Sequence, residues 1–227
     1  MKLPGSESSL NFIERFEKRR QEQAEKLASG LKINKAADDP AGLQIANRLT
    51  SAINEVDRRA SNARDQQSIY NTQAGQLSSI TDSLQRANEL AIQAGNPLND
   101  NSAIQAELDQ LTDEINIIAE SALGQTNFIS GLDASDPSAS QTIISDASAV
   151  IEQSAADIGA SSNGLDSRIN NYQISSINTS AARSRIQDTD FSESSSEQVK
   201  ADIQLKIAVL TKKDEEERKG LLFNQFI

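Results

Sequence analysis

Apolar residues recur every seven positions along a stretch of the chain from about Leu43 to Ala94. One register of this repeat consists of Leu49, Val56, Ala63, Tyr70, Leu77, Leu84 and Ala91. The second register begins at Ile53 and Ala60. Toward the end of the stretch it has shifted by one position, so that its last members are Ile80, Ala87 and Ala94. A straight helix of about 3.6 residues per turn drifts in this way against a 3.5-residue repeat. The pattern predicts one long helix that packs in a bundle, with Gly95 as its C-cap and Pro97 beyond its end.

A second helix is predicted to begin near Asn101-Ser102. Ser102 and Gln105 have the spacing of a capping box, in which each side chain satisfies a free backbone N–H. The apolar stripe of this helix is Ile104, Leu108, Leu111, Ile115, Ile118 and Ala122. The link to the preceding helix is short, which favours an antiparallel helical hairpin.

The helical pattern lapses between residues 124 and 141, where glycine, aspartate and proline interrupt it. Residues 126–129 could form a short strand, so this region is predicted to be a loop or one small β-hairpin. A seven-residue repeat then resumes, with Ile144, Ile151, Ile158, Leu165, Tyr172, Thr179 and Ile186. Gly159 and Gly164 each weaken a helix by about 1 kcal/mol relative to alanine, which predicts a kink or break near residues 161–164.

The two ends of the chain each carry an apolar helical stripe among many charges. Near the start, residues 10–27 include Phe12, Ile13, Phe16, Ala24 and Leu27; near the end lie Val199, Ile203, Ile207 and Leu210, followed by a mixed-charge run and an apolar tail. Neither helix can bury its stripe alone, and the simplest partner for each is the other. The predicted fold is therefore all-α: an elongated helical bundle or coiled-coil rod formed by pairing of the N- and C-terminal segments. Residues 1–40 and 188–227 would be the paired terminal helices, and residues 41–187 the rod.

The amino-acid composition excludes several classes of function, whereas it says less about the fold. The 227 residues are 37% hydrophobic but only 4% aromatic, which suits thin helical bundles with narrow cores. The net charge of −11 argues against nucleic acid, since binding phosphates needs a basic face. Cysteine and histidine are absent, so thiol chemistry, a histidine triad and a histidine-based zinc site are unavailable. We expect no catalytic residue, cofactor or metal, no membrane span and no cleaved signal peptide.

Two polar runs stand out beside the apolar repeats: residues 29–49 near the start and residues 182–191 near the end. Asp38 and Asp39 could belong to a metal loop, but an aspartate-rich turn that caps the next helix is the stronger interpretation. Arg183, Arg185, Asp188 and Asp190 could form a paired-charge active site; exposed ion pairs or contacts between subunits are favoured instead.

These runs resemble the signature motifs of bacterial flagellin N- and C-terminal regions, as do residues 84–93 (LQRANELAIQ), 104–107 (IQAE) and 124–128 (GQTNF). Several motifs in the right order make the resemblance specific, over about residues 25–128 and 158–203. It implies a rod built from both ends of the chain, export without a cleaved signal peptide through the flagellar apparatus with a chaperone, and polymerisation outside the cell into a filament that also contacts cap and junction proteins. The variable outer domains of the family look absent.

The resemblance also implies roles for particular residues. The expected subunit contacts are Leu31, Ile33, Asn34, Asp38, Asp39, Arg48, Arg183, Arg185, Asp188 and Asp190. Arg86, Leu90 and Glu107 match the rod positions that a vertebrate innate immune receptor recognises in this family; a solvated helix face is the alternative interpretation. We expect no nucleic-acid or membrane partner.

The chain departs from the family pattern at its charged ends, which carry Arg19 and Arg20 at the start and residues 212–219 at the finish. Residues 64–66 and 162–164 also differ from the family. The leading hypothesis is a structural subunit of the flagellar filament, and the alternative is a soluble, non-polymerising flagellin-like or hook-filament junction protein. An enzyme is disfavoured because no nucleophile and base stand together.

Overall fold

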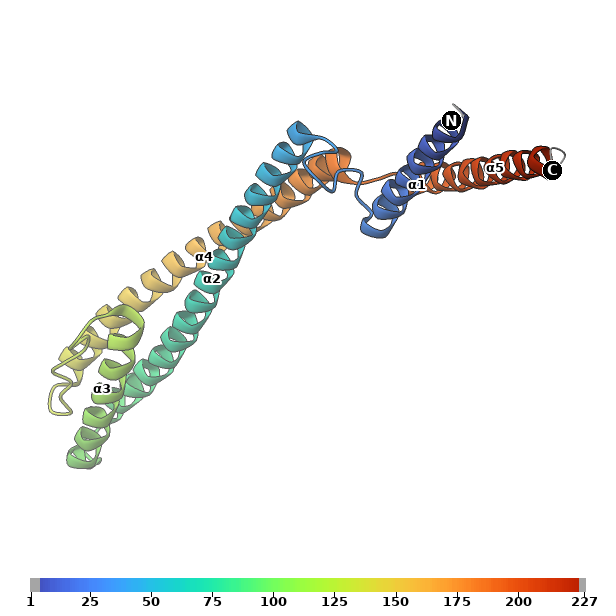
Figure 1. The fold of residues 1–227 in the computed structure, drawn as a ribbon. Helices are drawn as coiled ribbons and strands as arrows, with labels where there is room; N and C mark the ends of the chain where they lie inside the picture. Colours follow the sequence, from blue (N-terminus) through green and yellow to red (C-terminus); the bar gives the residue numbers. More distant parts are fainter. Residues whose placement is uncertain (1–4, 225–227) are drawn as a thin grey trace. The chain divides into compact units, whose positions relative to one another are not determined.

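The computed structural model describes the backbone of residues 5–224 and the side chains of residues 11–218. Over that range the chain forms five helices: α1 (Gly5–Ser29), α2 (Pro40–Ala94), α3 (Asn101–Leu123), α4 (Pro137–Gln187) and α5 (Phe191–Asn224) (Figure 1). The described residues contain no strand, and their one β-bridge joins Leu31 to Asp188. The all-α prediction is confirmed. The β-hairpin considered near residues 124–141 is wrong, because the chain there is an irregular loop that ends where α4 begins.

The chain divides into two compact units. The terminal unit contains Met1–Glu55 and Ser176–Ile227, and the central unit contains Val56–Ser175. Charge is divided unequally between them: the central unit holds the entire net charge of −11, and the acidic and basic residues of the terminal unit cancel.

Three helices share one apolar core in the central unit, where α3 lies beside the second part of α2 and the first part of α4 (Figure 1). The core residues of α2 are Leu77, Ile80, Leu84, Ala87, Leu90, Ala91 and Ala94. The second register therefore does shift as predicted, and Ala74 and Thr81 are exposed. From α3 the core takes Ile104, Leu108, Ile115, Ala119 and Ala122, which confirms the predicted stripe. Burial of this shared core stabilises all three helices together.

Helix α3 begins at Asn101, as predicted, but its capping differs from the prediction. Asp100, not Ser102, is the N-cap, and its side chain accepts a hydrogen bond from the Ser102 N–H at 3.0 Å. Gln105 is instead drawn to the loop before α4, where it accepts from the Ala134 N–H and donates to the Leu132 carbonyl oxygen. A tertiary contact thus takes the glutamine that the capping box would have used. Gly124, in the left-handed conformation, ends α3.

Helix α4 runs unbroken from Pro137 to Gln187, so of the kink or break predicted near residues 161–164 the break is wrong. Gly159 and Gly164 face open space and keep negative φ angles, and continuous backbone hydrogen bonding outweighs the small helix propensity of two glycines. The expected weakness appears in packing instead, since no α4 residue between Ile151 and Ile169 is fully buried.

Helices α1 and α5 pack against each other in the terminal unit. The covered side of α5 contains Ser194 and Ala201, with Leu205 and Ala208 half-buried. The predicted apolar stripe lies on the opposite side: Val199, Ile203, Ile207 and Leu210 are 52–65% exposed. The terminal helices do pair, but the prediction that this stripe is buried by the pairing is wrong. The side chains of the apolar tail lie outside the described residues.

Candidate functional site

The two polar runs singled out in the sequence meet in the terminal unit, where the link from α1 to α2 crosses the link from α4 to α5. The Lys32 N–H donates to the Gln187 carbonyl oxygen at 2.8 Å, and the Thr189 N–H donates to the Gly30 carbonyl oxygen at 2.9 Å. These two bonds flank the Leu31–Asp188 bridge. The Lys32 ammonium group adds a bond to the Arg185 carbonyl oxygen at 3.2 Å. We call this crossing, residues 30–42 with residues 183–190, the junction.

Two adjacent aspartates shape the first segment of the junction where it leads into α2. Asp38 accepts from the backbone N–H groups of Asn34 and Lys35, both at 2.9 Å, and these two bonds lower the pKa of its carboxyl group. Asp39 accepts from the N–H groups of Ala41 and Gly42, as an N-cap does, with Pro40 in the first helical position. The capping interpretation is confirmed for this turn, and the described residues contain no cluster able to hold a metal ion.

Gly42 allows the junction to close over Ile33. A Cβ atom at Gly42 would overlap the Asp39 carboxylate and would lie 2.7 Å from Ile33 Cδ1. Ile33 is buried there with Ala46, one turn further along α2. Glycine is the residue that permits this approach, because any side chain would displace either the cap or the buried isoleucine.

The second segment of the junction, residues 183–190, is also held by aspartate side chains that accept hydrogen bonds. Asp190 caps α5 by accepting from the N–H groups of Ser192 and Glu193. Asp188 accepts from the Ser184 hydroxyl in the last turn of α4. The hydroxyl groups of Thr189 and Ser194 lie 2.6 Å apart. Asp188 and Asp190, which were predicted as subunit contacts, therefore both make hydrogen bonds within the chain.

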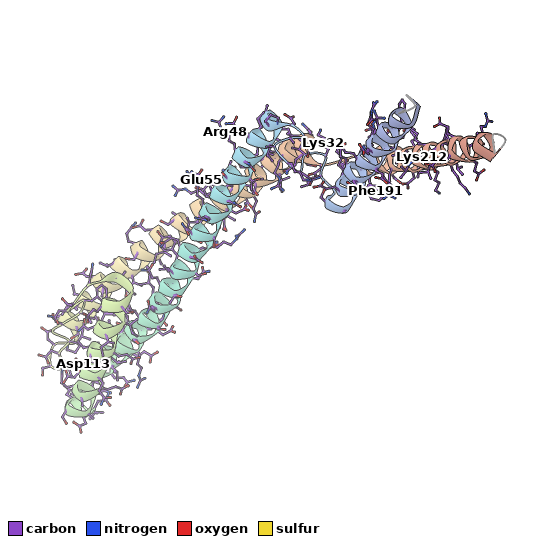
Figure 2. All side chains as sticks on the ribbon, in the orientation of Figure 1. Lys32, Arg48, Glu55, Asp113, Phe191 and Lys212 are labelled. Atoms are coloured by element: carbon purple, nitrogen blue, oxygen red, sulfur yellow. The ribbon has the colours of Figure 1, made fainter. Side chains whose placement is uncertain are left out.

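The basic residues of the two runs fall into two groups. Arg183 reaches the Thr50 hydroxyl at 3.4 Å, and Lys35 pairs with Glu25 at 2.7 Å, a hydrogen bond that raises the pKa of Lys35. Arg48 and Arg185 are exposed, and their guanidinium groups make no hydrogen bond or ion pair within the described chain. Figure 2 shows Lys32 on the link before α2 and Arg48 on the first part of α2. Among the predicted contact residues, these two arginines are exposed and their side chains have no hydrogen-bond or ion-pair partner in the described chain.

The three predicted receptor positions lie in the central unit and differ in accessibility. Arg86 forms an exposed ion pair with Glu107 at 2.8 Å and a second one with Glu89 at 3.2 Å, and its hydrogen bond to Glu107 is the main reason for its raised pKa. Leu90 is 2% exposed and belongs to the core. Arg86 and Glu107 are available on the surface in this structure, whereas the Leu90 side chain is not.

Sequence reasoning missed several residues that build the junction. Gly30, with φ +70°, ends α1, and Gln187 and Thr189 supply the backbone bonds across the crossing. The glycine that follows Ser29 was a sequence signal for a helix that ends at a residue in the left-handed conformation. The cross-chain backbone bonds had no local signal, because the partners are more than 150 residues apart.

Within the described part of the chain, no helix has the length and apolarity needed to cross a membrane. The sequence matches the family described as the bacterial flagellin N-terminal helical region over residues 6–132, and the bacterial flagellin C-terminal helical region over residues 141–212. Only residues 133–140 separate the two matches, as expected for a short form with no outer domain inserted in the middle.

Curated relatives agree with this assignment. The chain is 45% identical over 115 residues to flagellin B of Vibrio cholerae, a match that covers 49% of this chain and 31% of the relative. It is 48% identical over 107 residues to flagellin 1 of Proteus mirabilis, covering 46% of this chain and 28% of the relative. A flagellin of Clostridium tyrobutyricum is 48% identical over 98 residues, or 42% and 26% of the two chains. The matched segment thus spans about a third or less of each relative.

Proposed function

The chain belongs to the bacterial flagellin family, and we propose that it is a structural subunit of the flagellar filament, which polymerises through its helical rod and terminal helices. Flagellin is a family of structural proteins and not of enzymes. The observation that carries the proposal is the apolar stripe of α5. Val199, Ile203, Ile207 and Leu210 lie on one side of the helix and remain exposed although α1 covers the other side.

A stripe of four exposed apolar side chains is unfavourable for a protein that remains monomeric in water. Each such side chain gains about 1.5–3 kcal/mol when it is fully buried. The terminal unit also carries no net charge, so bringing two copies together there meets little electrostatic repulsion. Contacts between different surfaces of successive copies produce an open helical assembly when their rotation does not close. The stripe therefore supports self-association along a filament.

Family membership supports finer proposals. Residues 1–40 and 188–227 would form the inner tube of the filament, and residues 41–187 its rod. The chain would be exported without a cleaved signal peptide through the flagellar apparatus with a chaperone, and it would meet cap and junction proteins outside the cell. Arg48 and Arg185 would make subunit contacts, and Arg86 with Glu107 would carry any contact with a vertebrate innate immune receptor.

Replacement of the stripe tests the proposal. We compare the double variant Ile203→Lys and Ile207→Lys with the matched variant Gln204→Lys, which adds a charge on another exposed side of the same helix. Assembly is followed by sedimentation and by negative-stain electron microscopy, and circular dichroism verifies that each variant is helical. Loss of filaments in the double variant alone supports the proposal; equal assembly of all three proteins contradicts the role of the stripe.

A further inference from the structure

The charges of the central unit are segregated along its sequence. Residues 82–157 contain thirteen acidic residues and one arginine, a net charge of −12, and no lysine. That arginine, Arg86, is already paired with Glu89 and Glu107. In contrast, residues 58–65 of α2 contain three arginines and one aspartate. The unit therefore has an acidic part around α3 and a basic segment on α2.

The acidic part contains a hollow with an exposed apolar centre. Ile117 on α3 is 70% exposed and lies on the same side of the helix as Asp113 and Glu120, four residues before it and three after it. Together with Asn116, Thr126 and Asn127 these residues line an open hollow of about 320 Å³. Figure 2 shows Asp113 on α3 in this part of the unit. We call this surface the acidic hollow.

The wall of the acidic hollow is held in place. The Asn116 amide donates to the Ile129 carbonyl oxygen at 2.9 Å and accepts from the Ile129 N–H at 3.0 Å, which ties the loop after α3 to the helix. Asn127 adopts a left-handed conformation, with φ 53°, within that loop. The carboxylates of Asp113 and Glu120 make no ion pair with any described residue. The surface is thus formed before any partner arrives, and its charges are free.

The basic segment offers the complementary chemistry. Arg58 is exposed, lies on the side of α2 opposite the buried Ala60 and Ala63, and makes no ion pair within the described chain. Ile69 follows three helical turns later on the same side and is 51% exposed. Arg64 is exposed at the edge of this side, about 120° around the helix from Arg58 and next to the buried side. We call Arg58, Arg64 and Ile69 the arginine face; it combines positive charge with an exposed isoleucine, as the acidic hollow combines negative charge with one.

We propose that the acidic hollow of one copy receives the arginine face of a second copy. This inference rests on the proposed self-association and names a contact within it. Two acidic parts repel each other, whereas the acidic part of one copy attracts the basic segment of the next, so the charges favour head-to-tail contact. When one surface of a copy contacts a different surface of the next copy, each end of the assembly keeps one surface free. Further copies can therefore add without limit. The charges set the register between copies, and the isoleucines add apolar contact.

Charge reversal in both surfaces tests this pairing. The hollow variant carries Asp113→Arg and Glu120→Arg; the face variant carries Arg58→Glu and Arg64→Glu. A matched control carries Asp146→Arg and Glu152→Arg, which changes the charge of exposed α4 positions outside the hollow by the same amount. Circular dichroism and thermal melting show that each variant is folded. The critical concentration for assembly is measured by sedimentation at low salt, where exposed charges are screened least.

The expected result is a rise in critical concentration of about tenfold or more for the hollow variant and for the face variant, but not for the control. An equimolar mixture of the two reversed variants should assemble, because copies that alternate regain opposite charges at every contact. A chain with all four substitutions should also assemble alone. Wild-type behaviour of both reversed variants would overturn this pairing and leave the filament proposal intact. Failure of the unaltered chain to assemble in any condition would overturn both.

Discussion

The backbone N–H of Lys32 lies 2.8 Å from the carbonyl oxygen of Gln187, across 155 residues of sequence. This bond, its neighbour between Thr189 and Gly30, and the two aspartate caps fix the points where α1 ends, α2 begins, α4 ends and α5 begins. Two of the runs that resemble the family's motifs, residues 29–49 and 182–191, therefore meet where the two ends of the chain cross. Most of their polar side chains are used to build that crossing, which leaves Arg48 and Arg185 to face outward.

Gly42→Ala should destabilise the protein. The new methyl group would overlap the Asp39 cap and the buried Ile33, and overpacking of this kind costs about 1–3 kcal/mol. Urea unfolding followed by circular dichroism measures the loss. Gly75→Ala is the matched control in the same helix, because its Cβ would meet no atom within 4 Å; it should gain about 0.5–1 kcal/mol. Equal effects at both positions would contradict the close packing described at Gly42.

Asp38→Asn should remove a pH-dependent part of the stability. Hydrogen bonds from Lys35 and Asn34 hold the pKa of the Asp38 carboxyl below its ordinary value, so ionised Asp38 stabilises the folded state above the usual aspartate range. That contribution is lost as the pH falls through the lowered pKa. The variant should melt below the wild type at neutral pH, with the gap closing in acid. A gap that stays constant across the titration would show that the carboxylate charge does not contribute.

Leu90→Ala and Arg86→Ala should differ widely although both positions belong to the same motif. Leu90 is buried in the core, and such truncations cost about 2–5 kcal/mol. Arg86 loses only exposed ion pairs, which contribute little to stability because water screens them. Chemical denaturation of both variants gives the two values. A large loss for Arg86→Ala with a small one for Leu90→Ala would reverse the assignment of core and surface.

Gly159→Ala and Gly164→Ala should each stabilise α4 by about 0.5–1 kcal/mol. Both glycines lie in an unbroken helix, keep negative φ angles and face open space. Hydrogen exchange at the amides around residues 157–166 should slow in the double variant, because this is the part of α4 without a fully buried residue. A destabilised variant would show that a break at these glycines is needed after all.

The helices that bury a regular apolar stripe were predictable from the sequence. The shift of the second register of α2 to Ile80, Ala87 and Ala94 follows from helix geometry alone, and the structure buries those three residues. The Asp39 cap was also predictable, because its donors are two and three residues away. Helical periodicity and helix caps depend on residues that are close together in the sequence, and so the sequence predicts them.

Features that depend on distant partners were predicted less well. Gln105 was assigned to a capping box, but the loop before α4 draws it away. Ile203 and Ile207 were expected to face the other terminal helix, but they lie on the exposed side of α5, opposite Ala201 and Ala208. A stripe of apolar residues indicates that a helix has a partner, and it does not say whether that partner is in the same chain.

Electron microscopy of the purified chain across a concentration series tests the central claim most directly. If copies associate through the α5 stripe and the charged surfaces of the central unit, filaments with a regular helical repeat should appear above a critical concentration. A reconstruction of those filaments should show Val199, Ile203, Ile207 and Leu210 covered by neighbouring copies. Folded monomers alone at every concentration and salt level, with a fully helical circular dichroism spectrum, would contradict it.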